Sequence, residues 1–390
     1  MTQQRTAMLI FGTRPEAIKL APIAAKLAAD KEITPLIVVT GQHRSMLDQV
    51  LTTFEITPNY DLDLFRRGQN LARLTSRLVS GLDDVVAKSR PDVILVQGDT
   101  TTTFVGALTG FYNRIPVVHL EAGLRTHDLA QPFPEEGNRV VTSRLATYHL
   151  APTSWAKKNL LREGMARSTI SVTGNPVIDA LRWTLEHHSR PSSKAIERLW
   201  ASSGRLLLIT AHRRESWGGV LSEMALGIAD VARARPDVEI VFSVHGNPNV
   251  ARVVRSALAD FDNVTITRPL SYPDFVLMMQ RSYAIVSDSG GIQEEGPSLG
   301  RPVLVMRDTT ERPEGIAAGV ARLIGRSRIS IAKDILRLLD DERLYSTMAA
   351  AVNPYGDGRA ADRVLQCLRH VLYGTPRPRD FTPKKVREIR

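Results

Sequence analysis

The sequence has only one cysteine, which excludes a framework of internal disulfides. It has no run close to the roughly 18 apolar residues that a membrane-spanning helix needs, and its first residues lack the apolar stretch of a signal peptide. We therefore expect a cytoplasmic protein that does not enter a membrane. The cysteine itself, Cys367, lies among apolar residues at helical spacing, which is typical of a small buried side chain and not of a nucleophile.

Several cofactor motifs are absent as well. The turn at residues 12–19 lacks both the Gly-Lys-Ser/Thr ending of a Walker loop and the three spaced glycines of the dinucleotide fingerprint. This argues against NAD in its usual place. The sequence has no cysteine cluster, and no pair of histidines has the spacing of metal ligands, since His187 and His188 are adjacent. We therefore expect no metal.

The 390-residue chain is basic, with a net charge of +10. Six basic and two acidic side chains fall in the Pro-punctuated segment 374–390, so the rest of the chain is only moderately basic. Such a charge suits a polyanionic small ligand, a nucleic acid or an anionic membrane surface, and it also fits simple solubility. The basic residues are scattered without aromatic interleaving, so we do not expect a nucleic-acid-binding protein.

Short apolar runs recur along the chain, and most are apolar on both faces, as buried parallel strands are. Segments with helical apolar spacing separate them; in one, Asn70 is expected to cap a helix that begins at Leu71. This alternation predicts an α/β protein with two Rossmann-like, doubly wound parallel sheets. The predicted strands form two series of six: 8–11, 36–39, 93–96, 117–120, 148–150 and 170–172, then 206–209, 240–244, 264–266, 284–286, 303–305 and 322–324.

These strands predict two domains with a ligand cleft between them, facing the carboxyl ends of both sheets. We expect a last helix to return to the first domain, and the basic tail to be disordered. The predicted boundaries are 1–175 for the N-terminal Rossmann-like domain, 176–204 for a linker region, 205–358 for the C-terminal Rossmann-like domain, 359–373 for the returning helix and 374–390 for the tail.

The strand at 284–286 runs into the turn Ser287-Asp288-Ser289-Gly290-Gly291, and a helix-like segment follows. Small residues at a strand end let backbone N–H groups approach phosphate oxygens, and a helix start adds a favourable dipole. Glu295, one turn further on, could accept hydrogen bonds from a ribose diol. The alternative is a tight turn without a ligand, but the acidic pair and two glycines would serve no purpose there.

A second turn, at residues 12–19, follows the first strand and opens a helix at Pro15. It places Arg14 and Lys19 near the strand end, where both could meet a diphosphate. Without further information, both could also be ordinary surface charges.

Three carboxylates stand where parallel sheets usually place chemistry. Asp99 and Glu121 each follow a predicted strand, and Glu135 lies in the proline-rich loop 131–136. Carboxylates at strand ends converge on one edge, where burial would raise their pKa values towards useful proton transfer. Each could equally be a helix cap.

Two histidines also follow strands of the second series. His212, with Arg213, comes after the strand 206–209, and His245 after 240–244. They would face the first domain's acids, although either could be a packed or capping residue.

Four segments together closely resemble the non-hydrolysing UDP-N-acetylglucosamine 2-epimerases: 12–19, 97–101, 119–125 with 135–139, and 287–312. The resemblance spans about residues 7–372 and is specific, because the turn at Ser287 continues into the long motif 307–314. Two features depart from the pattern, namely Pro176, where many members have Thr, and the basic tail.

The resemblance implies a glycosyltransferase-B-like pair of Rossmann domains that interconverts UDP-GlcNAc and UDP-ManNAc without a cofactor. It also implies a homodimer and a place in cell-surface polysaccharide synthesis. The C2 proton has no neighbouring carbonyl to acidify it. The implied route is therefore elimination of UDP to 2-acetamidoglucal, followed by re-addition with inversion at C2.

By this resemblance, the catalytic residues are Asp99, Glu121 and Glu135, which would handle protons, and His212, which would steady the diphosphate with Arg14 and Lys19. The UDP contacts map onto the C-terminal domain, with one residue for the uracil, three for phosphate, one for the ribose and one near the phosphates: Phe275, then Ser289, Gly290 and Gly291, then Glu295, and Arg312. A second UDP-GlcNAc, acting as an activator, is implied at five positions: Gln42, His43, Arg213, Glu215 and His245.

Three other functions remain open at this stage. A hydrolysing 2-epimerase would release free ManNAc, although such enzymes usually begin differently at residues 13–16. A glycosyltransferase of the same architecture would need an acceptor. A UDP-sugar sensor would bind without turnover.

Overall fold

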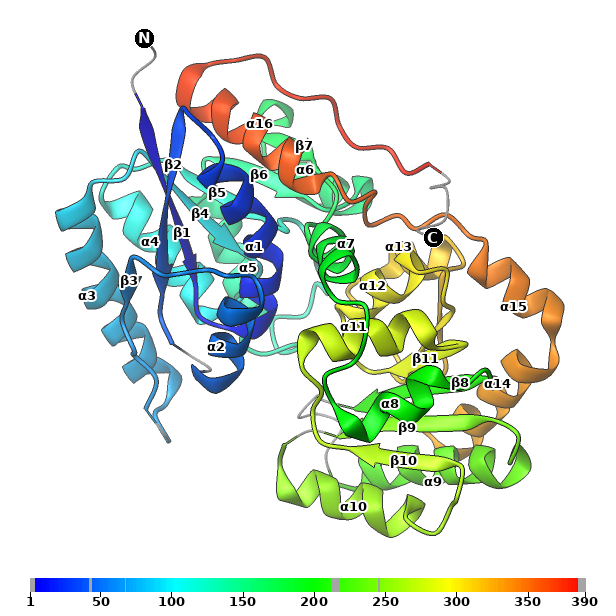
Figure 1. Ribbon diagram of the computed structural model, residues 1–390. Coiled ribbons are helices and arrows are strands. Elements are labelled where there is room, and N and C mark those ends of the chain that lie inside the picture. Colours follow the sequence, from blue (N-terminus) through cyan, green and yellow to red (C-terminus); the bar gives the residue numbers. More distant parts are fainter. Residues whose placement is uncertain (1–3, 42–43, 67, 212–217, 245, 385–390) are drawn as a thin grey trace. The chain divides into compact units, whose positions relative to one another are not determined.

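The computed structural model describes residues 4–41, 44–66, 68–211, 218–244 and 246–384. The chain divides into two compact units. Unit 1 comprises residues 1–180 and 355–382, and unit 2 comprises residues 181–354 and 383–390. Each unit is built on its own parallel sheet (Figure 1).

Unit 1 contains a seven-stranded sheet in the order β3-β2-β1-β4-β5-β6-β7, and every neighbouring pair is parallel. The order reverses between β1 and β4, as in doubly wound folds. The strands are β1 (Arg5–Phe11), β2 (Ile33–Val39), β3 (Tyr60–Asp61), β4 (Val93–Gln97), β5 (Val117–Leu120), β6 (Tyr148–Ala151) and β7 (Ile170–Val172).

Helices cover both faces of this sheet, with α3 and α4 on one face and α1 and α16 on the other (Figure 1). Asn70 caps α3 as predicted, since its side chain accepts from the backbone N–H of Arg73 at 2.9 Å. The helices are α1 (Arg14–Ala28), α2 (Arg44–Thr53), α3 (Leu71–Ser89), α4 (Thr101–Tyr112), α5 (Glu135–Leu145), α6 (Ser154–Arg162), the short η1 (Arg167–Thr169) and α16 (Ala360–Tyr373), while α7 (Val177–His187) begins in unit 1 and continues into unit 2.

Unit 2 contains a six-stranded parallel sheet in the order β10-β9-β8-β11-β12-β13, which reverses between β8 and β11. Its apolar core lies mainly between the sheet and the helices α9, α10 and α14. The strands are β8 (Leu206–Ala211), β9 (Glu239–Val244), β10 (Val264–Thr267), β11 (Ala284–Ser287), β12 (Val303–Val305) and β13 (Ala321–Leu323). The helices are α8 (Lys194–Ala201), α9 (Gly219–Ala234), α10 (Pro248–Leu258), α11 (Tyr272–Arg281), α12 (Ile292–Ser298), α13 (Pro313–Ala317), α14 (Arg328–Asp340) and α15 (Glu342–Ala349).

The predicted class, α/β with two Rossmann-like parallel sheets, is confirmed. All twelve predicted strands are present with ends shifted by a few residues, and unit 1 adds the two-residue strand β3, which the apolar pattern did not predict. The region expected to be a linker, residues 176–204, is largely helical, because it contains all of α7 and all of α8. Among the described residues, no helix is both long and apolar enough to cross a bilayer.

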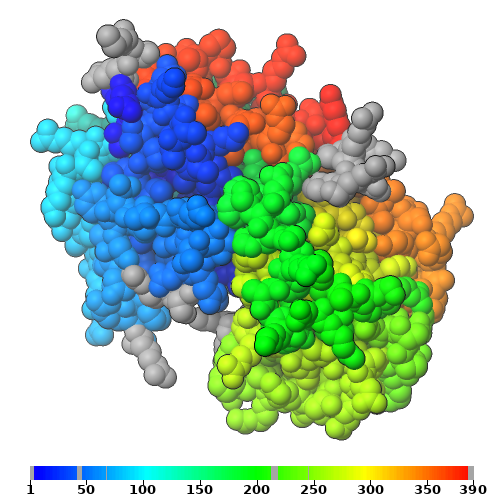
Figure 2. All heavy atoms as spheres, in the orientation of Figure 1, coloured from blue at the N-terminus to red at the C-terminus, as the bar shows by residue number. Residues whose placement is uncertain are grey.

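The C-terminal helix α16 packs against α1 within unit 1, and its orange-red atoms lie directly beside blue N-terminal atoms in Figure 2. Ion pairs reinforce this contact. Arg369 pairs with Asp30 at 2.5 Å and with Glu32 at 3.1 Å, and Lys26 pairs with Asp362 at 2.9 Å.

The described part of the basic tail differs from the disordered segment that we expected. The N–H of Phe381 donates to the carbonyl of Val172 on the edge strand β7 at 2.8 Å, and the buried Phe381 ring lies under the Arg363 guanidinium. Asp380 accepts from Lys157 at 2.5 Å and from the N–H of Val172 at 2.9 Å. Charge and proline content alone could not reveal these specific partners, which hold residues 380–381 along the edge of the sheet.

Candidate active site

The candidate site in unit 1 lies at the carboxyl ends of β1, β4 and β5, on both sides of the point where the strand order reverses. Glu121 follows β5 and has φ +62°, a left-handed conformation that is unfavourable for a side chain of this kind. Backbone strain of this type is concentrated at functional sites. The surrounding structure therefore holds Glu121 in a backbone conformation that a glutamate residue disfavours, which marks it as a candidate functional residue.

Glu121 is buried, and three side chains within the described ranges donate hydrogen bonds to it. The Lys19 ammonium contacts both carboxylate oxygens at 2.6 Å, and the pair is almost completely buried. Gln97 donates to Oε2, and Asn175 donates to Oε1 at 2.9 Å. The structure therefore joins Lys19, expected near a diphosphate, to Glu121, expected to handle protons.

Glu16 links the end of β1 to the start of α4. Its Oε2 accepts from the N–H groups of Gly12 and Thr13 at 3.0 and 2.7 Å, and from the Thr13 hydroxyl. Its Oε1 accepts from the hydroxyls of Thr100 and Thr103 at 2.6 and 3.1 Å. Burial raises the pKa of Glu16, although these hydrogen bonds oppose the shift.

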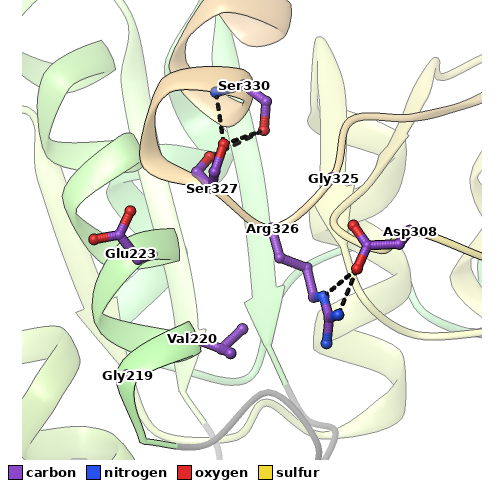
Figure 3. Close-up of a pocket in the computed structure, with 8 residues that line it drawn as sticks. All are labelled: Gly219, Val220, Glu223, Asp308, Gly325, Arg326, Ser327 and Ser330. Carbon is purple, nitrogen blue, oxygen red and sulfur yellow. Dashed lines mark hydrogen bonds and ion pairs between the residues drawn. The ribbon is translucent and has the colours of Figure 1, made fainter.

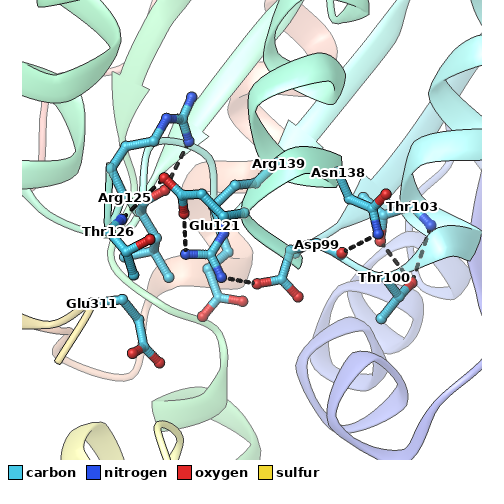
Figure 4. Close-up of polar contacts among 12 residues, drawn as sticks. Asp99, Thr100, Thr103, Glu121, Arg125, Thr126, Asn138, Arg139 and Glu311 are labelled. Carbon is cyan, nitrogen blue, oxygen red and sulfur yellow. Dashed lines mark hydrogen bonds and ion pairs between the residues drawn. The ribbon is translucent and has the colours of Figure 1, made fainter. Parts of the chain in front are cut away.

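Asp99, which follows β4, is half-buried and paired with Arg139 of α5 (Figure 4). Its backbone carbonyl accepts from the Asn138 side chain at 2.9 Å. Arg139 also pairs with the buried Glu136 at 3.0 Å. Helix α5 is therefore fastened to the end of β4, and its first residue, Glu135, is half-buried.

His119 is a fully buried residue of β5, two positions before Glu121. Its Nε2 is 2.7 Å from the carbonyl of Gly98 and must carry the proton, because a carbonyl can only accept. Burial lowers the pKa of His119 to about 4, so the ring is neutral near pH 7. The hydrogen bond holds Gly98, which has φ +77°, in the turn immediately before Asp99.

In unit 2, the predicted turn follows β11 on one side of the strand-order reversal. The side chains of Ser287 and Asp288 are fully buried, and the Ser287 hydroxyl accepts from the N–H of Ser289 at 3.0 Å. A Cβ atom on Gly290 would lie only 2.5 Å from the Arg312 guanidinium and 2.9 Å from its central carbon. Glycine at this position therefore allows Arg312 to lie directly over the turn.

Two carboxylates hold Arg312 in that place. Its Nε pairs with Glu294 of α12, and its Nη1 pairs with Glu311 at 2.6 Å, all three side chains being buried. Arg307 donates to the other oxygen of Glu311 at 2.8 Å. This network fixes an arginine beside a glycine turn, an arrangement suited to binding a phosphate group.

The other predicted nucleotide residues in unit 2 lie on α11 and α12. Glu295 is buried, and its Oε1 accepts from the Tyr272 hydroxyl at 2.9 Å. Phe275 lies one helical turn after Tyr272 and is also buried. Arg14 of unit 1 is half-buried at the first position of α1.

A pocket elsewhere in unit 2 lies between the start of α9 and the loop before α14 (Figure 3). It includes Glu223 and an ion pair between Arg326 and Asp308, but none of the predicted site residues. We therefore do not assign the candidate site to it. The described residues contain no group of three or more His, Cys, Asp or Glu side chains arranged for a metal ion.

Six predicted residues lie outside the described parts of the chain, so the structure gives no placement for them: Gln42, His43, His212, Arg213, Glu215 and His245. Conversely, several residues that organise the described site were not predicted. A capping-box signal, Thr13 followed three residues later by Glu16, could have identified Glu16. Asn175, Tyr272 and Glu294 carry no such local signal, because their partners are distant in the sequence. Glu311 pairs with Arg307 and Arg312, which are close in the sequence, and its place in the motif 307–314 could have identified it.

Comparison with known proteins assigns the family. Residues 25–369 match the family model described as UDP-N-acetylglucosamine 2-epimerase. The UDP-N-acetylglucosamine 2-epimerase of Yersinia pestis is 50% identical over 368 residues, covering 93% of this chain and 98% of that protein. A UDP-GlcNAc 2-epimerase from Neisseria meningitidis, solved bound to UDP-GlcNAc, is 44% identical with a TM-score of 0.87, covering 93% of this chain and 99% of that one.

The S. aureus MnaA–UDP co-structure is 42% identical with a TM-score of 0.91, and the match covers 97% of this chain and all of that one. These likenesses confirm the predicted glycosyltransferase-B-like fold. The residues matched by the family model include Glu121 of unit 1 and the glycine turn with Arg312 of unit 2. The chain therefore belongs to the UDP-N-acetylglucosamine 2-epimerase family.

Proposed function

We propose that this protein interconverts UDP-GlcNAc and UDP-ManNAc by inverting the sugar at C2. The observation that carries the proposal is Glu121, a buried carboxylate at a strand end that is held by Lys19, Gln97 and Asn175. A fixed carboxylate whose oxygens can only accept is suited to take a proton from carbon. Family membership supplies the substrate class.

The proposed route is elimination of UDP followed by its re-addition. As the C1–O bond breaks, the electron pair leaves with UDP, and positive charge develops at C1. The C2 proton becomes removable, and its loss gives 2-acetamidoglucal and UDP. Re-addition of UDP at C1, with protonation of C2 on the opposite face, completes the inversion without any net oxidation.

Within unit 1, we assign proton transfer to the carboxylates Asp99, Glu121 and Glu135. Asp99 is fixed by Arg139, and Glu121 by the three donors described above. Arg14, at the start of α1, would contact the departing diphosphate. The contact between Lys19 and both oxygens of Glu121 supports a role for Lys19 in holding this carboxylate, in addition to any contact with phosphate.

Within unit 2, we assign the UDP contacts to the turn and to the residues around it. The backbone of Ser289, Gly290 and Gly291 would donate to phosphate oxygens, with Arg312 supplying the positive charge. Glu295 would accept from the ribose hydroxyls, with Tyr272 fixing its other oxygen. Phe275 would contact the uracil. Two relatives solved with UDP or UDP-GlcNAc support this ligand class.

We further propose the non-hydrolysing form of the reaction, in which UDP stays bound until it returns to C1. The alternative is hydrolysis, in which water reacts at C1 and free ManNAc and UDP are released. The resemblance of residues 13–16 to the non-hydrolysing enzymes favours the first form. A transferase would consume UDP-GlcNAc only in the presence of an acceptor.

Incubation with UDP-GlcNAc in deuterated water, followed by NMR of C2, tests these alternatives. We expect deuterium at C2 together with growth of UDP-ManNAc. Free ManNAc with UDP would establish hydrolysis, and unchanged substrate would contradict both epimerase forms.

Glu121→Gln tests the residue assignment. It removes the proton acceptor while keeping nearly the same shape. We expect C2 exchange to fall by roughly 10²-fold or more, with UDP affinity by calorimetry close to that of the wild type. Persistent exchange would remove Glu121 from the proton-transfer step.

We propose two further properties from the family resemblance. The first is a homodimer, supported by exposed Phe111 and Tyr112 on α4 and Val141 on α5. Light scattering should give twice the 43.1 kDa chain mass. The second is activation by another UDP-GlcNAc molecule, which should make the rate depend sigmoidally on its concentration.

A further inference from the structure

Asn175 lies where the chain first leaves unit 1. The polypeptide passes between the units after Ala180 and returns at Tyr355. The backbone N–H of Asn175 donates to the carbonyl of Tyr355 at 2.6 Å. Both residues are fully buried, so this bond joins the outgoing and returning segments inside unit 1.

Close packing fixes this junction. A Cβ atom on Gly356 would lie 3.1 Å from the Ile178 side chain and 3.4 Å from the carbonyl of Asn175. Gly174 has φ +79°, and a Cβ atom there would lie 3.4 Å from the Cα of Gly356. The two segments therefore meet through glycines at nearly backbone-to-backbone distance, and Asn175 has little freedom to shift.

The side chain of Asn175 points in the other direction, to the candidate site. Its Oδ1 accepts from the N–H of Val177, the first residue of α7, at 3.1 Å. The amide NH₂ must then face the carboxylate, and it donates to Oε1 of Glu121 at 2.9 Å.

The donors to Glu121 that lie in the described part of the chain have different effects on the orientation of its carboxylate. Lys19 lies 2.6 Å from both oxygens and therefore does not distinguish between them. Gln97 donates to Oε2 and Asn175 donates to Oε1. These two amides together fix the rotation of the carboxylate plane, and only Asn175 belongs to the segment that leaves the unit.

We propose that Asn175 is a positioning residue for Glu121, tying the plane of its carboxylate to the junction between the outgoing and returning segments. The effect of this positioning on C2 inversion rests on the function proposed above. If Asn175 acts through Glu121, loss of the Asn175 side chain should change how Glu121 exchanges a proton. If Asn175 served only to start α7, its loss would leave that proton exchange unchanged.

Asn175→Asp separates these two roles. Aspartate keeps the acceptor for the N–H of Val177, but places a second carboxylate oxygen about 2.9 Å from Oε1 of Glu121. Because two adjacent carboxylates ionise less readily, we expect the pH midpoint of C2 exchange to rise by about one unit or more. An unchanged pH profile would overturn the proposal.

Asn175→Ser and Asn70→Asp serve as matched variants. Serine can still accept from the N–H of Val177 but is too short to reach Glu121, so kcat for C2 exchange should fall about tenfold with KM nearly unchanged. Asn70→Asp makes the same charge change at the cap of α3, where the cap accepts from the N–H of Arg73. It should leave the pH profile unchanged, and a shift equal to that of Asn175→Asp would overturn the proposal.

A second readout does not depend on turnover. Infrared difference spectra should report protonation of Glu121 through a carboxyl band that is lost on Glu121→Gln, with this substitution made in both the wild-type and Asn175→Asp backgrounds. A higher midpoint in Asn175→Asp supports positioning, and an equal midpoint overturns it. If the wild type does not exchange C2 hydrogen, the proposed function fails, but the infrared midpoint still decides the role of Asn175.

Discussion

At the scale of single residues, Glu16 holds together two parts of the site that come from different strands. It accepts five hydrogen bonds, three from Gly12 and Thr13 and two from Thr100 and Thr103. Thr100 follows Asp99 directly in the sequence, and Thr103 lies in the first turn of α4. Glu16 therefore fixes the positions of Arg14 and Asp99 relative to one another. Glu16 itself is assigned neither to diphosphate contact nor to proton transfer.

Substitution of Glu16 should separate loss of charge from loss of hydrogen bonds. In Glu16→Gln, the amide oxygen can still accept from the backbone, and the amide NH₂ can donate to the threonine hydroxyls. In Glu16→Ala, buried donors lose their acceptor, so we expect a loss of about 2 kcal/mol or more in the free energy of unfolding. Urea denaturation of both variants measures this difference, and equal stabilities would contradict the assigned role.

Gly290 offers a second test at this scale. In Gly290→Ala, the new methyl group would meet the Arg312 guanidinium at 2.5 Å, so the arginine must move away from the turn. If Arg312 binds phosphate, UDP affinity should fall about tenfold or more, because charge-assisted hydrogen bonds are lost. Calorimetric titration with UDP measures the change.

Gly204→Ala is the matched control for this experiment. A Cβ atom at Gly204 would meet its neighbours at ordinary distances, the nearest being the Ser202 hydroxyl at 3.5 Å. The residue lies just before β8, at the end of the strand away from the turn. UDP affinity should be unchanged. Equal losses in the two variants would show that the effect at Gly290 is not specific.

At the scale of elements, the C-terminal segment protects the edge of the unit 1 sheet. β7 is the last strand of that sheet, and Phe381 and Asp380 both bond to the backbone of Val172 within it. An uncovered strand edge invites pairing with another chain. Residues 380–381 therefore cover part of the free edge of β7, as a further strand would.

Phe381→Ala should weaken this cover. It removes a buried ring that packs under Arg363, so we expect a loss of about 3 kcal/mol in stability and more aggregation on heating. Thermal unfolding with light scattering measures both effects. Arg379→Ala changes a neighbouring exposed side chain and should behave as the wild type does. If both variants matched the wild type, the segment would have no protective role.

The elements also show what the sequence can predict. Strands such as β1 and β4 are buried on both faces, so a continuous apolar run identifies them. β3 has two residues, one of them exposed, and leaves no such pattern. Residues 380–381 were missed for a related reason, because their order comes from single partners far away in the sequence.

At the scale of the whole molecule, the position of the site was easier to predict than the hydrogen bonds and ion pairs within it. Asp99 and Glu121 were predicted because they follow strands, and parallel strands end at a common edge. Their partners Arg139 and Asn175 were not assigned roles, because only the folded chain brings them together. Lys19 was predicted as a cation near a strand end, but its contact with Glu121 could not be read from the sequence.

Stability at acid pH depends on several groups together. Within unit 1, buried histidines and carboxyls change the free energy of unfolding in opposite directions as the pH falls. Burial lowers the pKa of His119 to about 4 and that of His149 to about 3, from an ordinary value of 6.5. Between the folded and ordinary values the unfolded chain binds more protons, so both histidines make stability fall as pH drops below about 6.5.

Asp179 acts against the histidines. Burial raises its pKa to about 6 from 3.8, although it accepts from the N–H groups of Ala360 and Ala361 at the start of α16. Between pH 6 and 3.8 the folded protein holds the extra proton, so Asp179 makes stability rise as pH falls through that window. Burial also raises the pKa of Glu16, which acts in the same direction as Asp179, whereas the hydrogen bond from Lys26 lowers the pKa of Asp362, which acts with the histidines. We expect the histidines to dominate, which predicts a net loss of stability on acidification.

Urea denaturation at pH 7.5 and 4.5 tests this balance. We expect a lower midpoint at pH 4.5 for the wild type. The loss should be smaller in His119→Gln, which cannot take up a proton when it unfolds, and larger in Asp179→Asn, which lacks the opposing group. A wild-type midpoint that is equal or higher at pH 4.5, or a reversed order of the two variants, would show that other groups control the acid response.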